Sequence, residues 1–188
     1  MSDPVFAGAV SALGGVSFDG FATVREIGPV GMVTLRAKPD AAGLAEAVKA
    51  ATGCKLPGQR RIVRNGERAV GWMSPDEWLL VVPHGEAEAV VAAVSAALKG
   101  QHHLAVNVSD ARAVFRIEGS KADQVLRKLA PADIDRMEPD ELRRTRIAQV
   151  AGAFWREGDG FTLVCFRSVA GYVMGLLTHS AQPGSELG

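Results

Sequence analysis

Two adjacent carboxylates, Asp76 and Glu77, lie between two tryptophans, Trp72 and Trp78, in the stretch WMSPDEW. Paired carboxylates beside aromatic side chains could serve as a general acid and a general base. The alternative is a tight turn between two strands, because Pro-Asp is a turn sequence and aromatic residues are enriched in strands. We favour the turn, so that the stretch is interpreted as a hairpin and not as a catalytic pair.

A second candidate is the basic cluster Arg143-Arg144-Thr145-Arg146. Clustered guanidinium groups could bind a phosphate, a folate glutamate tail or an acidic partner surface. The alternative is a solvated strand start balanced by five acidic residues just upstream, Asp133, Asp135, Glu138, Asp140 and Glu141. We favour the solvated strand start, with a partner surface as the best functional alternative.

The histidines and cysteines do not follow the spacing of a metal site. His102-His103 precedes a predicted strand without a third ligand at recognisable spacing, and His84 and His179 are isolated. Cys54 and Cys165 are far apart, and we interpret them as reduced thiols. The glycines form neither a phosphate loop nor a dinucleotide fingerprint. The sequence therefore predicts no catalytic, cofactor-binding or metal-binding residue in this chain.

Composition limits the class of protein. The chain has 188 residues, of which 47% are hydrophobic and 22% charged, as in ordinary globular proteins. Lys+Arg and Asp+Glu both number 21, so the net charge gives no attraction to nucleic acid or to anionic lipid. No apolar run approaches the roughly 20 residues of a membrane span. We expect a cytoplasmic protein with a mobile N-terminal tail over residues 1–20 and a C-terminal tail over residues 181–188.

Strand and helix patterns alternate along residues 21–180. Paired strand patterns precede helices expected at about 40–53, 86–98, 120–131 and 169–178, and Asn65-Gly66 indicates a hairpin. Because the strands come in pairs, the fold class is α+β, with antiparallel sheets that carry helices on one face.

The chain also matches itself. A shift of 83 positions aligns Arg60-Arg61 with Arg143-Arg144, Trp72 with Trp155 and Trp78 with Phe161, and a shift of 82 aligns Val33 with Phe115. We infer an internal duplication with pseudo-repeats at 21–100 and 104–180.

Several segments resemble the gamma subunit family of heterotetrameric sarcosine oxidase. They are VNVSDARAVFRIEG (106–119), SPDEWLL (74–80), RRTRIAQV (143–150) and RSVAGY (167–172). The resemblance covers roughly residues 60–180. It implies the duplicated fold of the folate-binding domain of aminomethyltransferases.

The resemblance also implies a function. It implies an accessory subunit of an enzyme that oxidises sarcosine to glycine, making hydrogen peroxide and a one-carbon unit that passes to tetrahydrofolate or leaves as formaldehyde. The cofactors FAD, FMN, NAD, zinc and tetrahydrofolate would belong to other subunits. The partners would be the alpha, beta and delta subunits, alpha most directly, with no nucleic acid and no membrane.

One residue departs from the wider fold group. Aminomethyltransferases tend to carry a working aspartate where this chain has Asn107, in Asn107-Val108-Ser109, although Asp110 lies nearby. An amide does not ionise, so Asn107 cannot act as a general base. Thr52–Gln59 resembles the K-G-C-x-x-G-Q-E motif of a related folate-binding family incompletely, and we interpret it as a helix stop and loop. Two hypotheses follow: a non-catalytic subunit, or a stand-alone folate-binding or one-carbon-transfer protein.

Overall fold

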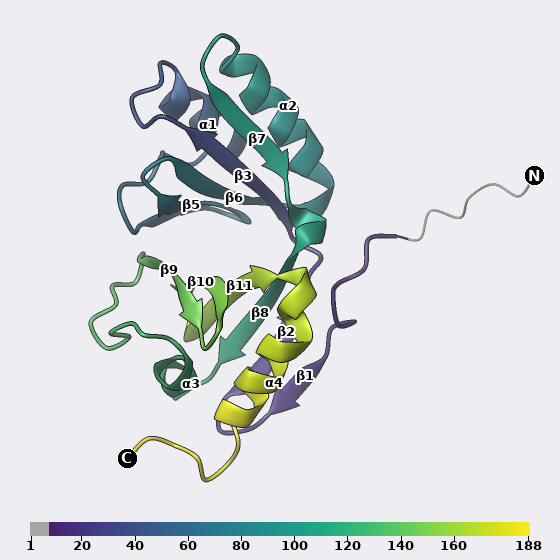
Figure 1. Ribbon diagram of the computed structural model, residues 1–188, viewed down its shortest axis with the longest axis vertical. Helices are drawn as coiled ribbons and strands as arrows, with labels where there is room; N and C mark the ends of the chain where they lie inside the picture. The colour runs from purple at the N-terminus through teal and green to yellow at the C-terminus, as the bar shows by residue number, and fades with distance from the viewer. Residues whose placement is uncertain (1–7) are drawn as a thin grey trace, which may run out of the picture.

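Two antiparallel sheets pack face to face in the computed structural model, which describes residues 8–188, and helices cover their outer faces (Figure 1). The first sheet has the order β4-β5-β6-β3-β7, with bounds Ile62–Asn65, Arg68–Ser74, Glu77–Val82, Gly31–Ala37 and His103–Asn107. The second sheet has the order β1-β2-β8-β11-β10-β9, with bounds Ser17–Asp19, Thr23–Ile27, Arg112–Glu118, Gly160–Phe166, Val150–Glu157 and Leu142–Ile147.

The helices occupy one face of each sheet, as the sequence predicts. Helices α1 (Leu44–Thr52) and α2 (Ala87–Ala97) cover the first sheet, and α3 (Ala122–Leu129) and α4 (Ala170–Ser180) cover the second. Three short 3-10 helices, η1 (His84–Glu86), η2 (Ser109–Ala111) and η3 (Arg167–Val169), lie at connections. The predicted α+β class is therefore confirmed, although α1 begins at Leu44 and not near residue 40.

Three apolar clusters hold the four layers together. One lies between the first sheet and α1 and α2, another between the second sheet and α3 and α4. A third fills the space between the sheets and includes Met32, Leu79, Val114, Trp155 and Val164. The central strands are buried on both faces, which explains why β6 and β11 read as continuous apolar runs and not as alternating ones.

The two sheets exchange their first strands. Strand β2 precedes β3 in the chain but pairs with β8 in the second sheet, and β7 precedes β8 but pairs with β3 in the first sheet. Two short connections, residues 28–30 and 108–111, therefore cross from one sheet to the other. Neither half can complete its own sheet without a strand from the other half.

Strands that the predicted duplication makes equivalent pair in the same register in both sheets. Val33 pairs with Leu80 in the first sheet, and its predicted equivalent Phe115 pairs with Leu163 in the second. In the same way Leu35 pairs with Trp78, and Ile117 pairs with Phe161. Each half contains three strands between its helices where the sequence predicts two. The Asn65-Gly66 hairpin divides 62–74 into β4 and β5, and a turn at Ala148-Gln149 divides 142–157 into β9 and β10.

The predicted equivalence of Trp72 and Trp155 is wrong by one residue. Val70 pairs with Leu80 and Phe154 with Leu163, so that Trp72 corresponds to Arg156. Trp72 packs on the helix side of its sheet, whereas Trp155 lies between the sheets. A register shift of one residue moves a side chain to the opposite face, and an irregularity in β5 between Trp72 and Ser74 hides that shift from the sequence.

The predicted match of the two arginine pairs is also wrong. Ile62 pairs with Gly71, and Leu142 pairs with Trp155, so Ile62 and Leu142 are the equivalent residues. Arg61 instead forms an antiparallel bridge with Glu141, where the edges of the two sheets meet.

The N-terminal segment differs from the expected mobile tail wherever the structure describes it. Residues 17–19 form β1, which pairs with the outer edge of β2, and residues 1–7 lie outside the described range. The carboxylate of Glu26, only 4% exposed, accepts hydrogen bonds from Ser11 Oγ at 2.8 Å, Leu13 N at 2.9 Å and Gly15 N at 2.9 Å. Arg167 also donates to Val10 O at 3.0 Å and to Ser11 O at 3.1 Å, so Glu26 and Arg167 together hold the arm formed by residues 8–16.

Replacing Glu26 tests this anchoring. We expect Glu26→Ala to lower the free energy of unfolding by about 1–3 kcal/mol, because it removes the shared acceptor of three part-buried hydrogen bonds. Limited proteolysis should then cut within residues 8–16 well before the rest of the chain. Glu46→Ala, on the exposed side of α1, is the matched control. An arm that resists proteolysis equally in both variants would contradict the anchoring role.

Candidate functional site

The WMSPDEW stretch forms the turn between β5 and β6, as predicted. Ser74 pairs with Glu77 across it, and Asp76 Oδ1 accepts a hydrogen bond from Ser74 Oγ at 2.8 Å. That hydrogen bond lowers the pKa of the exposed Asp76. The two carboxylates do not act as a pair, because Asp76 is exposed to solvent and Glu77 is buried.

Glu77 is the charged centre between the two sheets. It is 7% exposed, and its Oε2 lies 2.9 Å from Arg36 Nη2 of the first sheet and 3.4 Å from Arg144 Nη1 of the second. The two guanidinium groups offset the cost of burying the charge of Glu77. The arginines themselves remain partly solvated, so their own charges are not buried with it. Because Glu77 contacts one guanidinium group from each sheet, this geometry favours an electrostatic link between the sheets over acid–base chemistry.

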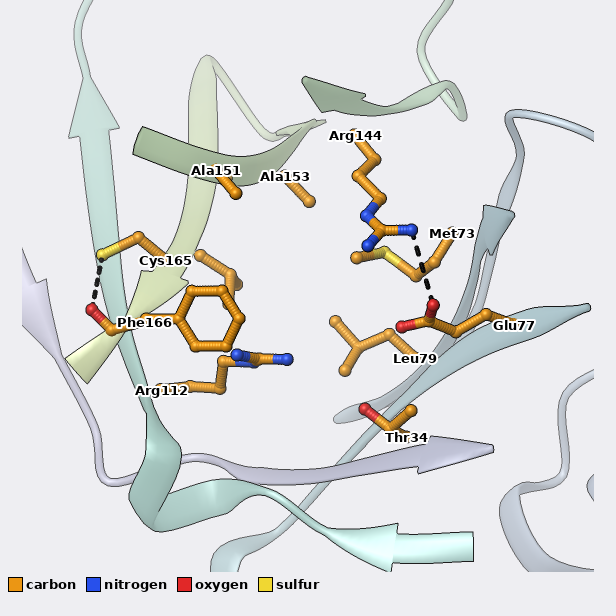
Figure 2. A pocket seen from close by; sticks show the side chains of 12 residues that line it. Thr34, Met73, Glu77, Leu79, Arg112, Arg144, Ala151, Ala153, Cys165 and Phe166 are labelled. Atoms are coloured by element: carbon orange, nitrogen blue, oxygen red, sulfur yellow. Dashed lines mark hydrogen bonds and ion pairs between the residues drawn. The ribbon is translucent and has the colours of Figure 1, made fainter. Parts of the chain in front are cut away.

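A small pocket opens beside this ion pair, where the sheets separate (Figure 2). Its cavity volume is about 50 Å³, which is room for one or two water molecules. Arg112, Arg144 and Glu77 supply the charged groups around it. The remaining walls are mainly apolar and come from Thr34, Met73, Leu79, Ala151, Gly152, Ala153, Val164, Cys165 and Phe166.

Arg112 is the least compensated charge in this pocket. Its guanidinium carbon lies 4.1 Å from the centre of the Phe166 ring, a cation–π arrangement. Within residues 8–188, it forms no ion pair and no hydrogen bond through its guanidinium. Burial lowers the pKa of Arg112, yet a guanidinium stays protonated in proteins. The pocket therefore presents a positive charge that suits a carboxylate brought by another molecule.

The duplication creates a related pocket at the opposite end of the inter-sheet space. Its cavity volume is about 180 Å³, and its lining includes Val30, Arg64, Ala69 and Trp155. Arg64 lies two residues after Ile62, as Arg144 lies two residues after its equivalent, Leu142. However, the residue equivalent to Arg112 in the first half is Val30, because each lies three residues before the equivalent pair Phe115 and Val33. The two ends thus share a framework and differ in charge.

Cys165 lines the first pocket but is a poor nucleophile. Burial raises the pKa of its thiol to about 12, a shift that nearby Arg112 only partly offsets. Cys54, beside the C-terminus of α1, also has a raised pKa because of burial. Both are free thiols, as predicted.

Asn107 lies outside these pockets and organises the crossover from β7 to β8. Its Oδ1 accepts hydrogen bonds from Ser109 N at 3.0 Å and Ser109 Oγ at 2.6 Å, and its Nδ2 donates to Glu88 Oε1 at 2.7 Å. Ser109 Oγ in turn accepts from Met32 N at 3.0 Å. An amide suits this position because the side chain both accepts from Ser109 and donates to Glu88.

The remaining candidates have structural roles. Glu141 pairs with Arg60 and, at 2.8 Å, with Arg143, whereas Glu138 and Asp140 pair with Arg61. The upstream acids thus balance the arginines of both halves and not the cluster 143–146 alone. Gly53, with φ of 73°, ends α1, in agreement with the predicted helix stop. Among residues 8–188, no group of three or more histidine, cysteine or acidic side chains could hold a metal ion.

Sequence reasoning missed Arg112, Phe166 and the partners of Glu77. Arg112 is half-buried although it begins a strand, and Arg36 and Arg144 lie 41 and 67 residues from Glu77 in the chain. A local pattern does not reveal such long-range pairing. The available signal was weak: Arg112 and Glu77 both lie in segments that resemble one protein family.

Comparison with known proteins decides the family. Residues 36–182 match the sarcosine oxidase, gamma subunit family. The chain belongs to the sarcosine oxidase gamma subunit family. It is 34% identical over 144 residues to sarcosine oxidase subunit gamma from Arthrobacter sp, covering 74% of this chain and 70% of that protein. Sarcosine oxidase subunit gamma from Corynebacterium sp. (strain U-96) is 35% identical over 141 residues, covering 73% and 67%.

Solved structures agree with this family membership. A chain of heterotetrameric sarcosine oxidase from Corynebacterium sp. U-96 superposes with a TM-score of 0.77 at 28% identity, covering 85% of this chain and 83% of that one. Aminomethyltransferase T of the glycine cleavage system from Bartonella henselae matches with a TM-score of 0.61 at 16% identity, covering 84% and 45%. The second likeness concerns the fold, and confirms the predicted relation to aminomethyltransferases. Across the described part of the chain, helices long and apolar enough to cross a bilayer are absent.

The role of Asn107 in this gamma-family chain can be tested by restoring a carboxylate. We expect Asn107→Asp to lower stability at pH 7 by roughly 1 kcal/mol, because a hydrogen bond to Glu88 becomes a repulsion between like charges. The loss should shrink below about pH 4, where carboxyl groups take up protons. Urea unfolding measures it, with Asn107→Asp/Glu88→Gln as the control that removes the repulsion. Equal stability of all three proteins would contradict the assigned role.

The raised pKa of Cys165 predicts slow thiol chemistry. In a Cys54→Ala background at pH 8, a disulfide reagent should label the folded chain about a thousandfold more slowly than the unfolded chain, given the rise from 9.0 to about 12. Because the folded-state pKa is raised, the protonated thiol stabilises the fold fully below pH 9, and this contribution is lost as the pH approaches 12. Equal labelling rates in the folded and unfolded states would contradict this.

Proposed function

We propose that this chain is the gamma, accessory subunit of a heterotetrameric sarcosine oxidase. The observation that carries the proposal is the family match over 36–182, together with a superposition on a chain of such an oxidase at a TM-score of 0.77. In this role the chain assembles with alpha, beta and delta subunits, alpha most directly. The complex oxidises sarcosine to glycine with hydrogen peroxide and a one-carbon unit, passed to tetrahydrofolate or released as formaldehyde. We place the complex in the cytoplasm, where free thiols such as Cys54 and Cys165 persist.

We further propose that this chain has no catalytic centre of its own. Three candidate groups support this view. Glu77 is held between two arginines, the thiol of Cys165 has a pKa of about 12, and Asn107 uses both ends of its amide within the fold. FAD, FMN, NAD, zinc and tetrahydrofolate would then act through the other subunits. The chain would contribute surfaces that hold the assembly together.

The alternative is a stand-alone folate-binding or one-carbon-transfer protein. Its support is the aminomethyltransferase fold and the larger inter-sheet cavity of about 180 Å³, which has Arg64 and Arg68 in its lining. These arginines could bind the carboxylates of a folate tail. Arg68 is already paired with Glu86 at 2.6 Å, which weakens this alternative.

Co-expression separates the two functions. The chain, tagged and expressed with the alpha, beta and delta subunits, should co-elute with them in equal amounts on size exclusion, and the complex should produce peroxide when sarcosine is added. The chain expressed alone should give no saturable signal in a folate titration. A monomer that ignores the other subunits and binds folate would contradict the subunit function and support the alternative.

A further inference from the structure

The two exchanged strands, β2 and β7, occupy equivalent places, but only one of them is covered. The outer edge of β2 pairs with β1, through Ser17 with Arg25, Phe18 with Val24 and Asp19 with Thr23. Strand β7 ends the first sheet, and within residues 8–188 no strand pairs with its outer edge. The chain itself thus shows what can occupy such an edge: a short antiparallel strand.

The backbone of β7 is oriented to accept a strand. Val108 N donates to Met32 O at 2.8 Å, so Val108 and Met32 form a hydrogen-bonded pair. Hydrogen-bonded and non-hydrogen-bonded pairs alternate along an antiparallel ladder, so Val106 with Thr34 and Leu104 with Arg36 are hydrogen-bonded pairs as well. Leu104 and Val106 therefore direct their backbone groups toward β3. The N–H and C=O groups of the intervening His103 and Ala105 point away from β3, toward the open edge.

The side chains beside this edge are apolar although they are exposed. Leu104 is 53% exposed and Val106 is 39% exposed. Both lie on the face that looks toward the second sheet, because Val106 pairs with Thr34 and Leu104 with Arg36 on β3. An unprotected edge with apolar side chains is one that natural proteins usually cover.

This face continues into the pocket that contains Arg112. Thr34 lines that pocket, and Figure 2 shows it on the opposite side from Phe166, with Arg112 between them. Arg36 and Arg144 are paired with Glu77, whereas Arg112 has no carboxylate partner within the described residues. A molecule lying along β7 would therefore meet apolar surface first and an unpaired positive charge at the end of the strand.

We propose that the outer edge of β7 binds an extended segment of another subunit, which adds an antiparallel strand to the first sheet. Apolar side chains of this segment cover Leu104 and Val106, and an acidic side chain pairs with Arg112. The inference rests on the proposed function, because it requires an assembly. A second copy of this chain fits less well, since pairing two β7 edges would leave both Arg112 side chains without a carboxylate.

Two pairs of variants test the edge in the co-expressed complex. Ala105→Pro removes an outward N–H without breaking the ladder to β3, and Ala105→Ser keeps that N–H. Leu104→Ser removes exposed apolar surface, and Tyr172→Ser does the same at a comparably exposed site on α4. We expect at least a tenfold weaker affinity for the other subunits with Ala105→Pro, and a several-fold loss with Leu104→Ser. Both serine controls should bind as the unaltered chain does.

Hydrogen exchange gives an independent readout. Residues 103–107 of the unaltered chain should exchange more slowly in the complex than in the free chain, whereas β4, at the other edge of the sheet, should change little. Leu104→Ser leaves the backbone intact, so it reports on the surface even where Ala105→Pro weakens folding.

The outcomes separate this inference from the proposed function. Full assembly by both Ala105→Pro and Leu104→Ser, with unchanged exchange in β7, would overturn the inference and leave the subunit function intact. An unaltered chain that binds none of the other subunits would overturn the subunit function. A chain that forms homodimers alone, and loses them with Ala105→Pro, would show that a second copy occupies the edge and would overturn the partner assigned here.

Discussion

The backbone of Met32 is the point where the two halves of the molecule are joined. Its carbonyl accepts from Val108 N at 2.8 Å, and its N–H donates to Ser109 Oγ at 3.0 Å. Both bonds lie where the exchanged strands cross between the sheets, and Met32 itself is buried in the inter-sheet cluster. Because each sheet contains a strand from the other half, neither half can unfold without breaking a sheet in both.

Differences between the two halves carry more functional information than their likeness. Both halves place an arginine near a mouth of the inter-sheet space, Arg144 at one end and Arg64 at the other. Only one end adds a buried carboxylate, Glu77, where the other half has Gly160. The free edges differ as well, because β1 covers β2 while β7 ends its sheet. Thr34 lines the charged pocket and pairs with Val106 of the open edge, so the two features are neighbours, which suits a surface for assembly.

Much of the fold could be predicted from the sequence, since its signals are local. Turn residues located the hairpins at Asn65-Gly66 and Pro75-Asp76, and apolar periodicity located four helices. The strand exchange could not be predicted, because alternation tells which face of a strand is buried but not which sheet the strand joins. The alignment of Trp72 with Trp155 was wrong for a related reason, since an irregular strand changes faces without a clear change in composition. The charged pocket was missed because its residues come from seven strands and meet only in the folded chain.

Chemical unfolding followed at single tryptophans tests most directly whether strand exchange makes the molecule one unit. Trp72 and Trp78 report on the first sheet, and Trp155 reports on the cluster between the sheets. Variants with phenylalanine at the other tryptophan positions let each region be followed in urea, beside the circular dichroism of the whole chain. The strand exchange predicts a single transition with the same midpoint for every probe in a given variant. Separate midpoints for the two regions would contradict it, because they would mean that one sheet survives without the strand it shares.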